Sequence, residues 1–583
     1  MKLNFYFKFF SIFLLCSCFL AATAQQRQIT GKVVDDSNLP LPGASVSVKG
    51  GKAVTRTNQN GNFTIEVPSE SSILLIKFLG MTSLEVNVAN QTSVNVKMAS
   101  SSSALDEVVV VGYGSQKKAD LTGAVGSIKG EQLSRVATTD VVQAMQGRIA
   151  GVSVMSNSGQ PGSGAKITIR GLGSLSGGSP VYVVDGYQTS DISYLAPNDI
   201  SNIDVLKDAS ATAIYGSRGA NGVVMITTKK GQNGPAKFSF DSYTGLQQAW
   251  KTIPMVNATQ YAKLVTQGYT NEGQSVPVNL ATRLDFLGAG NFTGTNWQKE
   301  IFQKGIMQNH TLTASGGSER NKFRLSGTYF EQEGIIKNSG MKKFFLNFVN
   351  DLNVNKWLTT GVSANFINYD KTYYNGDYYS GVLTNALMAD PIAAAWDKDT
   401  NNWGRADVSF MANPARVVSF LKNNKGYGTS LVGNVYADAK IVNGLSFKTQ
   451  FGTSYNASHN KSYNPKFNVD VQEQNLLSSL SESRGAGLNW VWTNYFNYNK
   501  SFGDHSLNAM VGAEVQDNSD NNIHVTAYNV PAESDLQYLE ASKNIEYNVG
   551  SGQGANGMRS FFGRVNYNYK SKYLLTATLR NDA

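Results

Sequence analysis

The feature that most constrains the fold is a period of two in hydrophobicity, which runs from about residue 237 to the end of the chain. In segments of about ten residues, every second side chain is apolar and its neighbours are small or polar, as in residues 445–455, 358–366 and 573–580. Successive side chains of a strand point to opposite faces, so these segments predict strands with one apolar and one polar face. A transmembrane β-barrel requires such strands, because one face meets lipid and the other a wet lumen.

The main alternative for this region is a large soluble β-sandwich or propeller. Charged residues make up only 16% of the chain, below the roughly 25% of soluble domains, which favours the barrel. Aromatic residues at expected strand ends are typical of interfacial girdles: Trp357, Trp490, Trp492, Tyr567 and Tyr569. Long polar segments such as residues 370–427 suit barrel loops. We therefore predict a mainly β protein whose residues 233–583 form an incomplete antiparallel transmembrane barrel.

The number of strands bears on whether this barrel closes. About eleven strands can be recognised, and the last, at residues 573–580, has no partner after it in the sequence. Bacterial single-chain barrels have even strand numbers, and an unpaired strand edge in lipid costs several kcal/mol per group. The expectation is that the chain is a C-terminally truncated part of a longer protein.

The first 24 residues have the pattern of a secretory signal peptide. Lys2 and Lys8 form a basic region, residues 9–20 are apolar, and Ala22-Thr23-Ala24 is a small-residue cleavage site. The two cysteines of the chain, Cys16 and Cys18, lie inside this segment, so the mature chain would have none. A lipoprotein signal with acylation at Cys18 is the alternative, but the cleavage site fits better.

Three further segments precede the barrel. Residues 25–99 alternate in short runs broken by turn residues and predict an Ig-like β-sandwich. Residues 100–116 form a linker, which ends in a run rich in valine. Residues 117–232 mix strand-like runs with two short helical patterns and predict a compact α+β domain.

The motifs of these segments resemble SusC/RagA-type TonB-linked outer-membrane proteins. The run LDEVVVVGYGSQ at residues 105–116 resembles the family's junction between N-terminal extension and plug, and ordered matches continue to Val223. The sandwich is similar to a carboxypeptidase regulatory-like domain, although Gly80-Met81 stands where that domain usually has Gly-Tyr. The resemblance implies that residues 117–232 are a plug, that the extension is periplasmic, and that the inner-membrane TonB complex energises the protein.

The valine run is the candidate coupling segment, or TonB box. β-Branched residues favour an extended backbone, and an extended segment can add as a strand to a partner's sheet edge. The alternative is a buried strand of the plug itself. The candidate residues are Asp106, Glu107, Val108, Val109, Val110, Val111 and Gly112.

The plug motif contains charged residues among glycines. We interpret its charged residues as plug-to-barrel salt bridges and turn anchors, with ligand contact as the alternative, and its glycines as turn positions. The residues of this motif are Arg170, Gly171, Asp185, Gly186, Lys207, Asp208, Tyr215, Gly216, Arg218, Gly219 and Gly222.

Substrate contacts are expected on the outward loops and on the outer surface of the plug. Aromatic side chains can stack on sugar rings or peptide side chains, although rim aromatics more often mark the membrane interface. The weak candidates are Tyr373, Tyr374, Tyr378, Tyr379 and Trp396. The resemblance implies import of oligosaccharides or oligopeptides with a SusD-like surface lipoprotein. The alternatives are a receptor that signals ligand occupancy to a periplasmic regulator, and a secreted β-rich binding protein.

No enzyme is predicted from this sequence. The four histidines are far apart and belong to no ligand cluster, so neither a metal site nor a cofactor is expected. The net charge of +9 comes from scattered basic residues, which does not indicate nucleic-acid binding.

Overall fold

The computed structural model describes two compact units, which divide between Glu107 and Val108. Its described residues are 27–35, 38–51, 53–67, 73–78, 81–89, 91–98, 108–112, 114–117, 123–156, 158–171, 173, 178–290, 293–374, 381–542 and 547–583. The predicted signal peptide therefore lies outside the described residues. No helix within these ranges is both long and apolar enough to cross a membrane.

The first unit is a β-sandwich of two small sheets. One sheet has the order β4-β1-β7 (Asn62–Val67, Arg27–Val34, Ser93–Lys97), and the other β3-β2-β5-β6 (Val54–Arg56, Ser45–Val48, Ile73–Lys77, Leu84–Asn87). Alternate apolar residues of the strands, such as Ile29, Ile65 and Ile76, are fully or almost fully buried between the sheets. The period of two in this segment therefore builds a core from one face of each strand.

The plug contains a five-stranded sheet of order β10-β15-β16-β13-β14. Its strands span Val125–Lys129, Ile200–Leu206, Val223–Thr228, Val181–Val184 and Tyr187–Thr189. A separate hairpin pairs β11 (Val152–Ser156) with β12 (Ala165–Ile169). The short helices of the plug are α2 (Gly130–Ser134), α3 (Val141–Ala144), α4 (Ala209–Thr212), η2 (Pro197–Asp199) and η3 (Ala213–Asn221).

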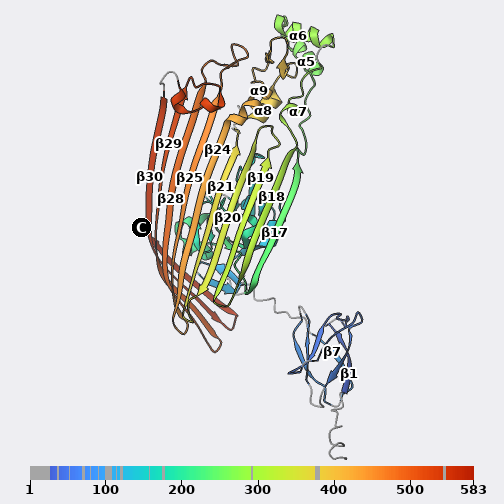
Figure 1. The fold of residues 1–583 in the computed structure, drawn as a ribbon, viewed down its shortest axis with the longest axis vertical. Coiled ribbons are helices and arrows are strands. Elements are labelled where there is room, and N and C mark those ends of the chain that lie inside the picture. The colour runs from blue at the N-terminus through green and yellow to red at the C-terminus, as the bar shows by residue number, and fades with distance from the viewer. Residues whose placement is uncertain are drawn as a thin grey trace, which may run out of the picture. The chain divides into compact units, whose positions relative to one another are not determined.

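An antiparallel sheet of eleven strands forms the rest of this unit, and we call it the wall (Figure 1). Each wall strand pairs with its neighbours along the sequence, which confirms the predicted number and direction of strands. The edges of this open sheet are β17 and β31. The strands are β17 (Gly234–Gln247), β18 (Gly305–Gly317), β19 (Asn321–Glu333), β20 (Gly340–Asn353), β21 (Leu358–Thr372), β24 (Asn424–Val442), β25 (Leu445–Asn464), β28 (Ser479–Phe502), β29 (His505–Tyr528), β30 (Tyr547–Tyr569) and β31 (Tyr573–Asp582).

The two ends of the wall differ in the length of their connections. At one end, which we call the turn end, the strands are joined by short turns such as residues 443–444 and 503–504. At the other, the loop end, long connections carry the remaining elements, several of which are labelled in Figure 1. They are α5 (Ala258–Asn271), α6 (Val278–Gly288), α7 (Trp297–Ile301), α8 (Val382–Met388), α9 (Pro414–Phe420), β22 (Trp396–Asp397), β23 (Asn402–Trp403), β26 (Phe467–Asn468), β27 (Gln474–Asn475), η4 (Leu421–Asn423), η5 (Ser534–Leu536) and η6 (Leu539–Ala541).

The two faces of the wall have the predicted difference in character. On β25, Phe451 and Tyr455 are 41% and 46% exposed, whereas Gln450 and Ser454 between them are 5% and 6% exposed. Phe447 on the same strand is half-buried. Apolar side chains therefore form an outward belt, and the polar face looks inward. One expectation about aromatics is wrong, because Trp490 and Trp492 lie midway along β28 rather than at its end.

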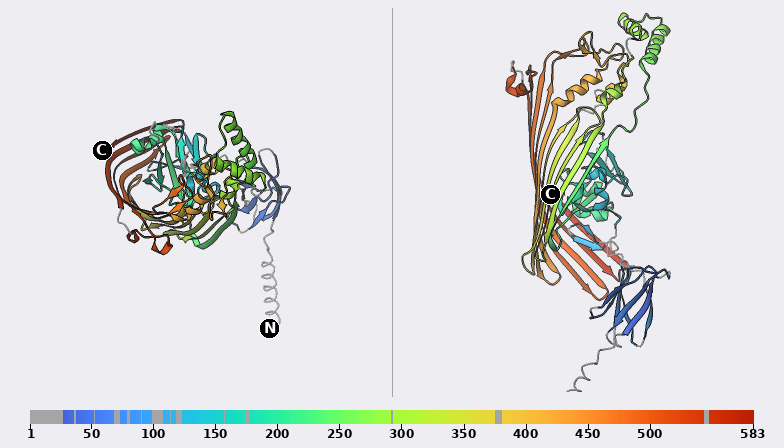
Figure 2. Two further views of the ribbon diagram at one scale, coloured as in Figure 1. Left: turned by 90° about the horizontal axis from the view of Figure 1, so that it is seen from above. Right: turned by 45° about the vertical axis from the view of Figure 1, so that its right-hand side comes forward.

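The plug lies on the inner, concave face of the wall (Figure 2). One apolar core runs from the plug into wall residues Phe345, Ile367, Val432 and Val491, and a second one reaches Tyr495, Met510 and Phe562. At this contact the hydroxyl of Tyr187, which belongs to plug strand β14, hydrogen-bonds Ser454 of β25 at 3.1 Å. The plug and the wall therefore share two apolar cores.

Candidate functional site

A buried ion pair joins the plug to the wall near the first strands of the sheet. The Nη1 atom of Arg324 on β19 lies 2.8 Å from Oδ1 of Asp199 in the plug, and the two side chains are 6% and 3% exposed. The Ser326 hydroxyl donates to the same carboxylate oxygen at 2.6 Å, and Arg324 also donates to Asn347 at 3.2 Å. Buried charges persist only when they are paired and hydrogen-bonded, so each partner depends on the other.

A second polar contact lies at the last strands of the wall. The amide of Gln188 in the plug donates to both carboxylate oxygens of Glu514 on β29, each at 3.1 Å. Arg580 on β31 donates to the same carboxylate at 2.8 Å and to the carbonyl of Ile214 in the plug at 2.9 Å. This contact therefore holds the plug through an almost fully buried ion pair of the wall.

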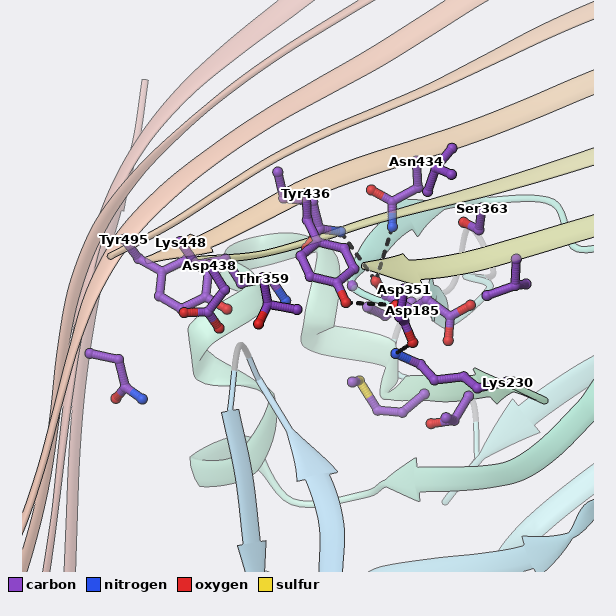
Figure 3. A pocket seen from close by; sticks show the side chains of 18 of the residues that line it. Asp185, Lys230, Asp351, Thr359, Ser363, Asn434, Tyr436, Asp438, Lys448 and Tyr495 are labelled. Carbon is purple, nitrogen blue, oxygen red and sulfur yellow. Dashed lines mark hydrogen bonds and ion pairs between the residues drawn. The ribbon is translucent and has the colours of Figure 1, made fainter. Parts of the chain in front are cut away.

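A chamber of about 540 Å³, with several charged side chains in its lining, lies between plug strands β13 and β16 and the wall (Figure 3). The Nζ atom of Lys230 lies 3.0 Å from the carboxylate of Asp351, and the Tyr436 hydroxyl donates to that carboxylate at 2.7 Å. Lys448 and Asp438 also line the chamber, and these wall residues lie towards the turn end. A space of this size with charged lining groups can hold water, so part of the interface between plug and wall is not apolar.

Asp185 and Gly186 form the tight turn between β13 and β14 at this chamber. Both residues have positive φ, at +48° and +89°. The Asp185 carboxylate accepts hydrogen bonds from the backbone N–H and the hydroxyl of Thr228, at 3.0 and 2.6 Å. Burial raises the pKa of the Asp185 carboxyl, and the Thr228 hydrogen bonds oppose that shift only in part. The Asp185 carbonyl accepts hydrogen bonds from wall residues Asn434 and Gln450, at 3.1 and 3.2 Å.

Three other charged residues of the plug motif make contacts inside the plug. Arg170 forms an ion pair with Asp208, whose carboxylate also accepts a hydrogen bond from the backbone N–H of Ala124. These two contacts, that of Ala124 first, lower the pKa of Asp208. Lys207 donates to the carbonyl of Ala150 at 2.5 Å. The expectation of plug-to-barrel salt bridges is therefore wrong for these residues, because their partners are loops of the plug's own surface.

Arg218 is a charged side chain of the motif that reaches a wall side chain, and its partner there is neutral. Its guanidinium donates to the Gln516 amide oxygen on β29 at 2.5 Å, so the contact is a hydrogen bond and not the expected salt bridge. Nearby, Tyr215 is fully buried and its hydroxyl contacts Met225 Sδ at 3.0 Å.

The motif glycines occupy turns or close contacts. Gly171, Gly216 and Gly222 have positive φ, from +65° to +97°. Gly219 has no such φ, but a Cβ there would lie 2.8 Å from the carbonyl oxygen of Thr212. These positions therefore shape the plug backbone, which is the role that glycine's missing side chain permits.

The described part of the candidate coupling segment is a small hairpin. Val108–Val111 (β8) pairs antiparallel with Gly114–Lys117 (β9), and neither strand belongs to the five-stranded sheet of the plug. Gly112 at the turn is buried with φ +67°, and a Cβ there would meet the Arg564 guanidinium at 3.0 Å and Ile214 at 3.3 Å. Asp106 and Glu107 lie outside the described residues. The hairpin turn therefore sits where plug and wall meet.

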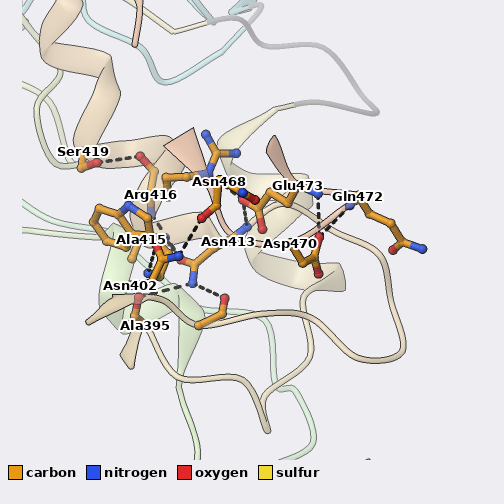
Figure 4. A network of polar contacts seen from close by, with 12 residues as sticks. Ala395, Asn402, Asn413, Ala415, Arg416, Ser419, Asn468, Asp470, Gln472 and Glu473 are labelled. Atoms are coloured by element: carbon orange, nitrogen blue, oxygen red, sulfur yellow. Dashed lines mark hydrogen bonds and ion pairs between the residues drawn. The ribbon is translucent and has the colours of Figure 1, made fainter. Parts of the chain in front are cut away.

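Polar contacts tie the loops together at the loop end of the wall (Figure 4). The Asn413 amide donates to the carbonyls of Ala394, Ala395 and Gly404 at 2.8–3.3 Å. In the connection between β25 and β28, the carboxylate of Glu473 lies 2.6 Å from Arg416 and accepts the Asn413 backbone N–H at 2.8 Å. These bonds join the connection between β21 and β24 to the next one.

The connection between β17 and β18 is tied to the same group of loops through Asp390. This fully buried carboxylate accepts the Tyr261 hydroxyl at 2.7 Å. It also accepts the backbone N–H groups of residues 407, 408 and 409, at 2.8, 2.7 and 3.0 Å. Three outer loops therefore form one hydrogen-bonded assembly.

The aromatic residues considered for substrate contact are spread over these loops. Trp396 on β22 is half-exposed and stacks edge-on against Trp403, with ring centroids 4.9 Å apart. Tyr374 packs against the apolar cluster beneath α7, α8 and α9, and the Lys371 ammonium lies 5.8 Å from the Tyr373 ring centroid. Tyr378 and Tyr379 lie outside the described residues. Within the ranges that the structure describes, no group of three or more acidic, histidine or cysteine residues is placed to hold a metal ion.

Two stretches of the chain match known domain families. Residues 117–223 match the TonB-dependent receptor plug domain, and residues 29–110 match the CarboxypepD_reg-like domain. Together with the strand wall that holds the plug on its inner face, these matches define the class of TonB-dependent receptors.

Relatives narrow this class. The chain is 32% identical over 588 residues to a TonB-dependent receptor of Formosa agariphila, with 98% of this chain and 54% of that one covered. It is 30% identical over 625 residues to the TonB-dependent receptor SusC of Bacteroides thetaiotaomicron, with 100% and 59% covered. The solved structure of the RagAB peptide importer in the open-open state matches with a TM-score of 0.72 and 26% identity, covering 82% of this chain and 56% of that one.

The chain belongs to the SusC/RagA-type TonB-dependent receptors. It spans about half the length of the curated relatives it matches.

The contacts between plug and wall were not predicted from the sequence. No sequence pattern marks the charged residues that join the plug to the wall, which include Asp199, Arg324 and Glu514. In each of these contacts the plug residue and the wall residue lie more than a hundred positions apart in the sequence. Asn413 stands directly before Pro414, which is a helix-start pattern, so its role in capping α9 could have been recognised.

Proposed function

We propose that the protein is a TonB-dependent outer-membrane transporter that imports oligosaccharides or oligopeptides. The observation that carries this proposal is a plug on the inner face of a strand wall, where buried ion pairs and a chamber with charged lining residues lie between two shared apolar cores. An interface of this kind can open under force without exposing a wholly apolar surface. An outward apolar belt on the wall supports placement in a membrane.

Coupling is assigned to residues 106–112, directly before the plug. The partner that we propose is TonB of the inner-membrane complex, which would pair with the valine strand by β-augmentation. A pull on β8 would act first on Gly112, which lies against Ile214 of the plug and Arg564 of the wall. The site of action is therefore the junction of the two parts that must separate.

The remaining parts of the proposal concern placement and partners. The N-terminal sandwich would lie in the periplasm, and a SusD-like surface lipoprotein would cover the loop end. One solved relative is a peptide importer by name, whereas SusC is named only as a TonB-dependent receptor. The proposed substrate therefore stays an oligosaccharide or an oligopeptide. A neighbouring lipoprotein gene beside glycosidase genes or peptidase genes would distinguish the two.

Deleting residues 107–111 from the protein expressed from its own gene tests the coupling assignment. We expect energised uptake to be lost while expression and ligand binding persist, because the folded plug and wall remain. Deletion of residues 100–104, of equal length in the preceding linker, is the matched control and should leave uptake intact. Unimpaired growth of the first variant on the transported nutrient would contradict the proposal.

A further inference from the structure

A pocket of about 300 Å³ lies on the outer face of the wall, at the loop end of the neighbouring strands β19, β20, β21 and β24 (Figure 1). We call it the outer pocket. The lining side chains of Lys342, Asp370 and Lys425 point away from the plug, because they share strand faces with the exposed belt residues Phe344 and Leu431. The outer pocket is therefore separate from the chamber of Figure 3, which lies on the inner face.

The outer pocket borders directly on the apolar belt. Along β20, Lys342 is followed on the same face by Phe344 and Leu346, which are 43% and 39% exposed. Two residues of a strand span about 7 Å, so the charged row begins one step above the last belt residue. Tyr427 of β24 lies in that row, and tyrosine is typical of the membrane interface. Long loops are extracellular in such barrels, so the outer pocket lies at the headgroup level of the outer leaflet.

Three lysines and three carboxylates line the outer pocket, but part of this charge is already paired. The Glu331 carboxylate lies 3.0 Å from the Nζ atom of Lys342 and accepts two further hydrogen bonds, each at 2.9 Å. Glu333 accepts the backbone N–H of Ile306 at 3.1 Å. These three side chains therefore have protein partners without any ligand.

The other two lysines, Lys422 and Lys425, keep their charge available. In the part of the chain that the structure describes, neither forms an ion pair. The Lys425 ammonium donates to the Thr372 hydroxyl at 2.9 Å, which directs it along the pocket, and Lys422 is exposed in η4. An ammonium has three donors, so both lysines can still donate to an anion. Phosphate is an anion that paired lysines commonly bind.

Asp370 adds an acceptor beside these cations. It lies opposite Lys342 in the pairing of β20 with β21, and opposite Tyr427 in the pairing of β21 with β24. Its carboxylate can accept from a hydroxyl or an amine. A ligand with a phosphate, neighbouring hydroxyls and an apolar part fits this order of cations, carboxylate and belt.

We propose that the outer pocket binds the phosphorylated sugar headgroup of an outer-leaflet glycolipid, with Lys422 and Lys425 on the phosphate and Asp370 on a sugar hydroxyl. The acyl chains would lie along the belt below it, at Phe344 and Leu346. Basic groups at a membrane surface attract anionic headgroups in general, and a pocket adds a fixed position for one of them. The inference goes beyond the proposed function, because it concerns the lipid-facing surface and neither the substrate nor the coupling.

A lipid in this position would connect two outer loops. The outer pocket is lined by Asn338 and Ser339 of the connection between β19 and β20, and by Lys422 of the connection between β21 and β24. The second connection carries α8 and α9 and belongs to the hydrogen-bonded loop assembly. The bound headgroup would therefore help to hold that assembly at the membrane surface.

The test measures lipid binding to the full-length protein in detergent micelles, by mass spectrometry of the intact complex. The probes are phosphorylated glycolipid from the outer membrane that carries the protein, the same glycolipid after removal of its phosphate, and inorganic phosphate. We expect one phosphorylated glycolipid per chain, and binding that is at least about tenfold weaker without the phosphate, because charge-assisted hydrogen bonds are lost. Inorganic phosphate at equal concentration should not compete, because the acyl chains add apolar burial.

Two double variants assign the binding to the outer pocket. Lys422→Gln with Lys425→Gln should raise the glycolipid concentration for half-occupancy about tenfold or more. Lys304→Gln with Lys337→Gln is the matched control, since it removes the same charge at the loop end from residues that do not line the pocket. This control should change the concentration less than about twofold. Lys422→Gln alone replaces the first double variant if the latter does not assemble.

Four outcomes would overturn the site: no glycolipid is bound, the dephosphorylated form binds equally well, inorganic phosphate displaces the lipid, or the two double variants respond alike. The third would indicate a site for free phosphate, and the fourth a general attraction between lysines and lipid. Each of these outcomes would leave the transport proposal standing.

Discussion

Arg324 and Asp199 form an ion pair between the wall and the plug, with 2.8 Å between Nη1 and Oδ1 and both side chains buried. The pair lies close in space to the point where the plug continues into the first wall strand, because Lys229 donates its backbone N–H to the Asp199 carbonyl at 2.8 Å. One end of the plug is therefore held in place both by its covalent connection to the wall and by the buried ion pair.

Arg324→Met should lower the free energy of unfolding of the plug by about 3–5 kcal/mol, because it leaves the Asp199 carboxylate buried without its cation. The double variant with Asp199→Asn should recover part of that loss, since no charge is then left unpaired. Urea unfolding of the purified protein, followed by protease access to the plug, measures both. Glu331→Gln is the control, because its pair with Lys342 at 3.0 Å is partly exposed and should contribute less than about 1 kcal/mol. Equal losses in all variants would contradict a special role for the buried pair.

Gly452→Ala should weaken the packing of the plug against the wall. A Cβ at this position on β25 would lie 2.2 Å from the ring of Tyr187, so the plug would have to shift. We expect a loss of about 1–3 kcal/mol in plug stability, typical of overpacking. In Gly327→Ala, on β19, a Cβ meets nothing within 4 Å, and the same measurement should change by less than about 0.5 kcal/mol. Neither glycine has a positive φ, so the difference reports packing alone.

Asp185→Asn should make the plug more stable at neutral pH. Burial raises the pKa of Asp185 in the folded protein above the ordinary value of about 3.9. The stability that this group contributes is therefore present below about pH 4 and is lost as the pH rises through the folded-state pKa. The stabilisation by Asp185→Asn should shrink as the pH falls towards 4, which unfolding curves at several pH values would show.

Asp208→Asn is the control of opposite sign. Hydrogen bonds lower the pKa of Asp208, so its contribution is present above about pH 4 and is lost as the pH falls through the folded-state pKa. This variant should therefore be less stable than the wild type at neutral pH. A shared sign for the two variants would show that the two carboxyls do not differ in the stated way.

Phe451→Arg tests the outward belt. A lipid-facing arginine near the middle of a barrel strand costs about 2–4 kcal/mol, and the cost falls to about 0–1 kcal/mol near the interface. Phe502→Arg, at the turn end of β28, is the matched variant for the second case. The fraction of protein with heat-modifiable migration should fall for the first variant and stay unchanged for the second. Equal assembly of both would argue against a lipid-facing position for Phe451.

The period of two in hydrophobicity was enough to predict the wall. A strand with lipid on one face and a polar interior on the other must alternate apolar and polar side chains. This period did not predict the length of the strands: β28 and β29 each have 24 residues, against the expected ten or so. Backbone pairing continues past the apolar belt, since ladder hydrogen bonds need no apolar side chain. The polar ends of the strands therefore lack the alternation of apolar and polar residues from which their length could have been predicted.

The contacts of the plug were the least predictable part. Arg170 and Arg218 occur in the same motif, yet the first pairs inside the plug and the second reaches Gln516 on the wall. Which partner a charged side chain meets depends on how the plug is oriented against strands that come hundreds of residues later. The glycines were easier to interpret, because a positive φ at Gly186 or Gly222 is a local property of the turn.

The hydrogen bond from Tyr187 to Ser454 spans 267 positions of the chain. The ribosome therefore finishes the plug long before it makes the strands that cover it, and the apolar face of the plug that contacts the wall stays uncovered until then. We expect a nascent chain of this kind to need holding chaperones, and seating of the plug to be a late step of assembly.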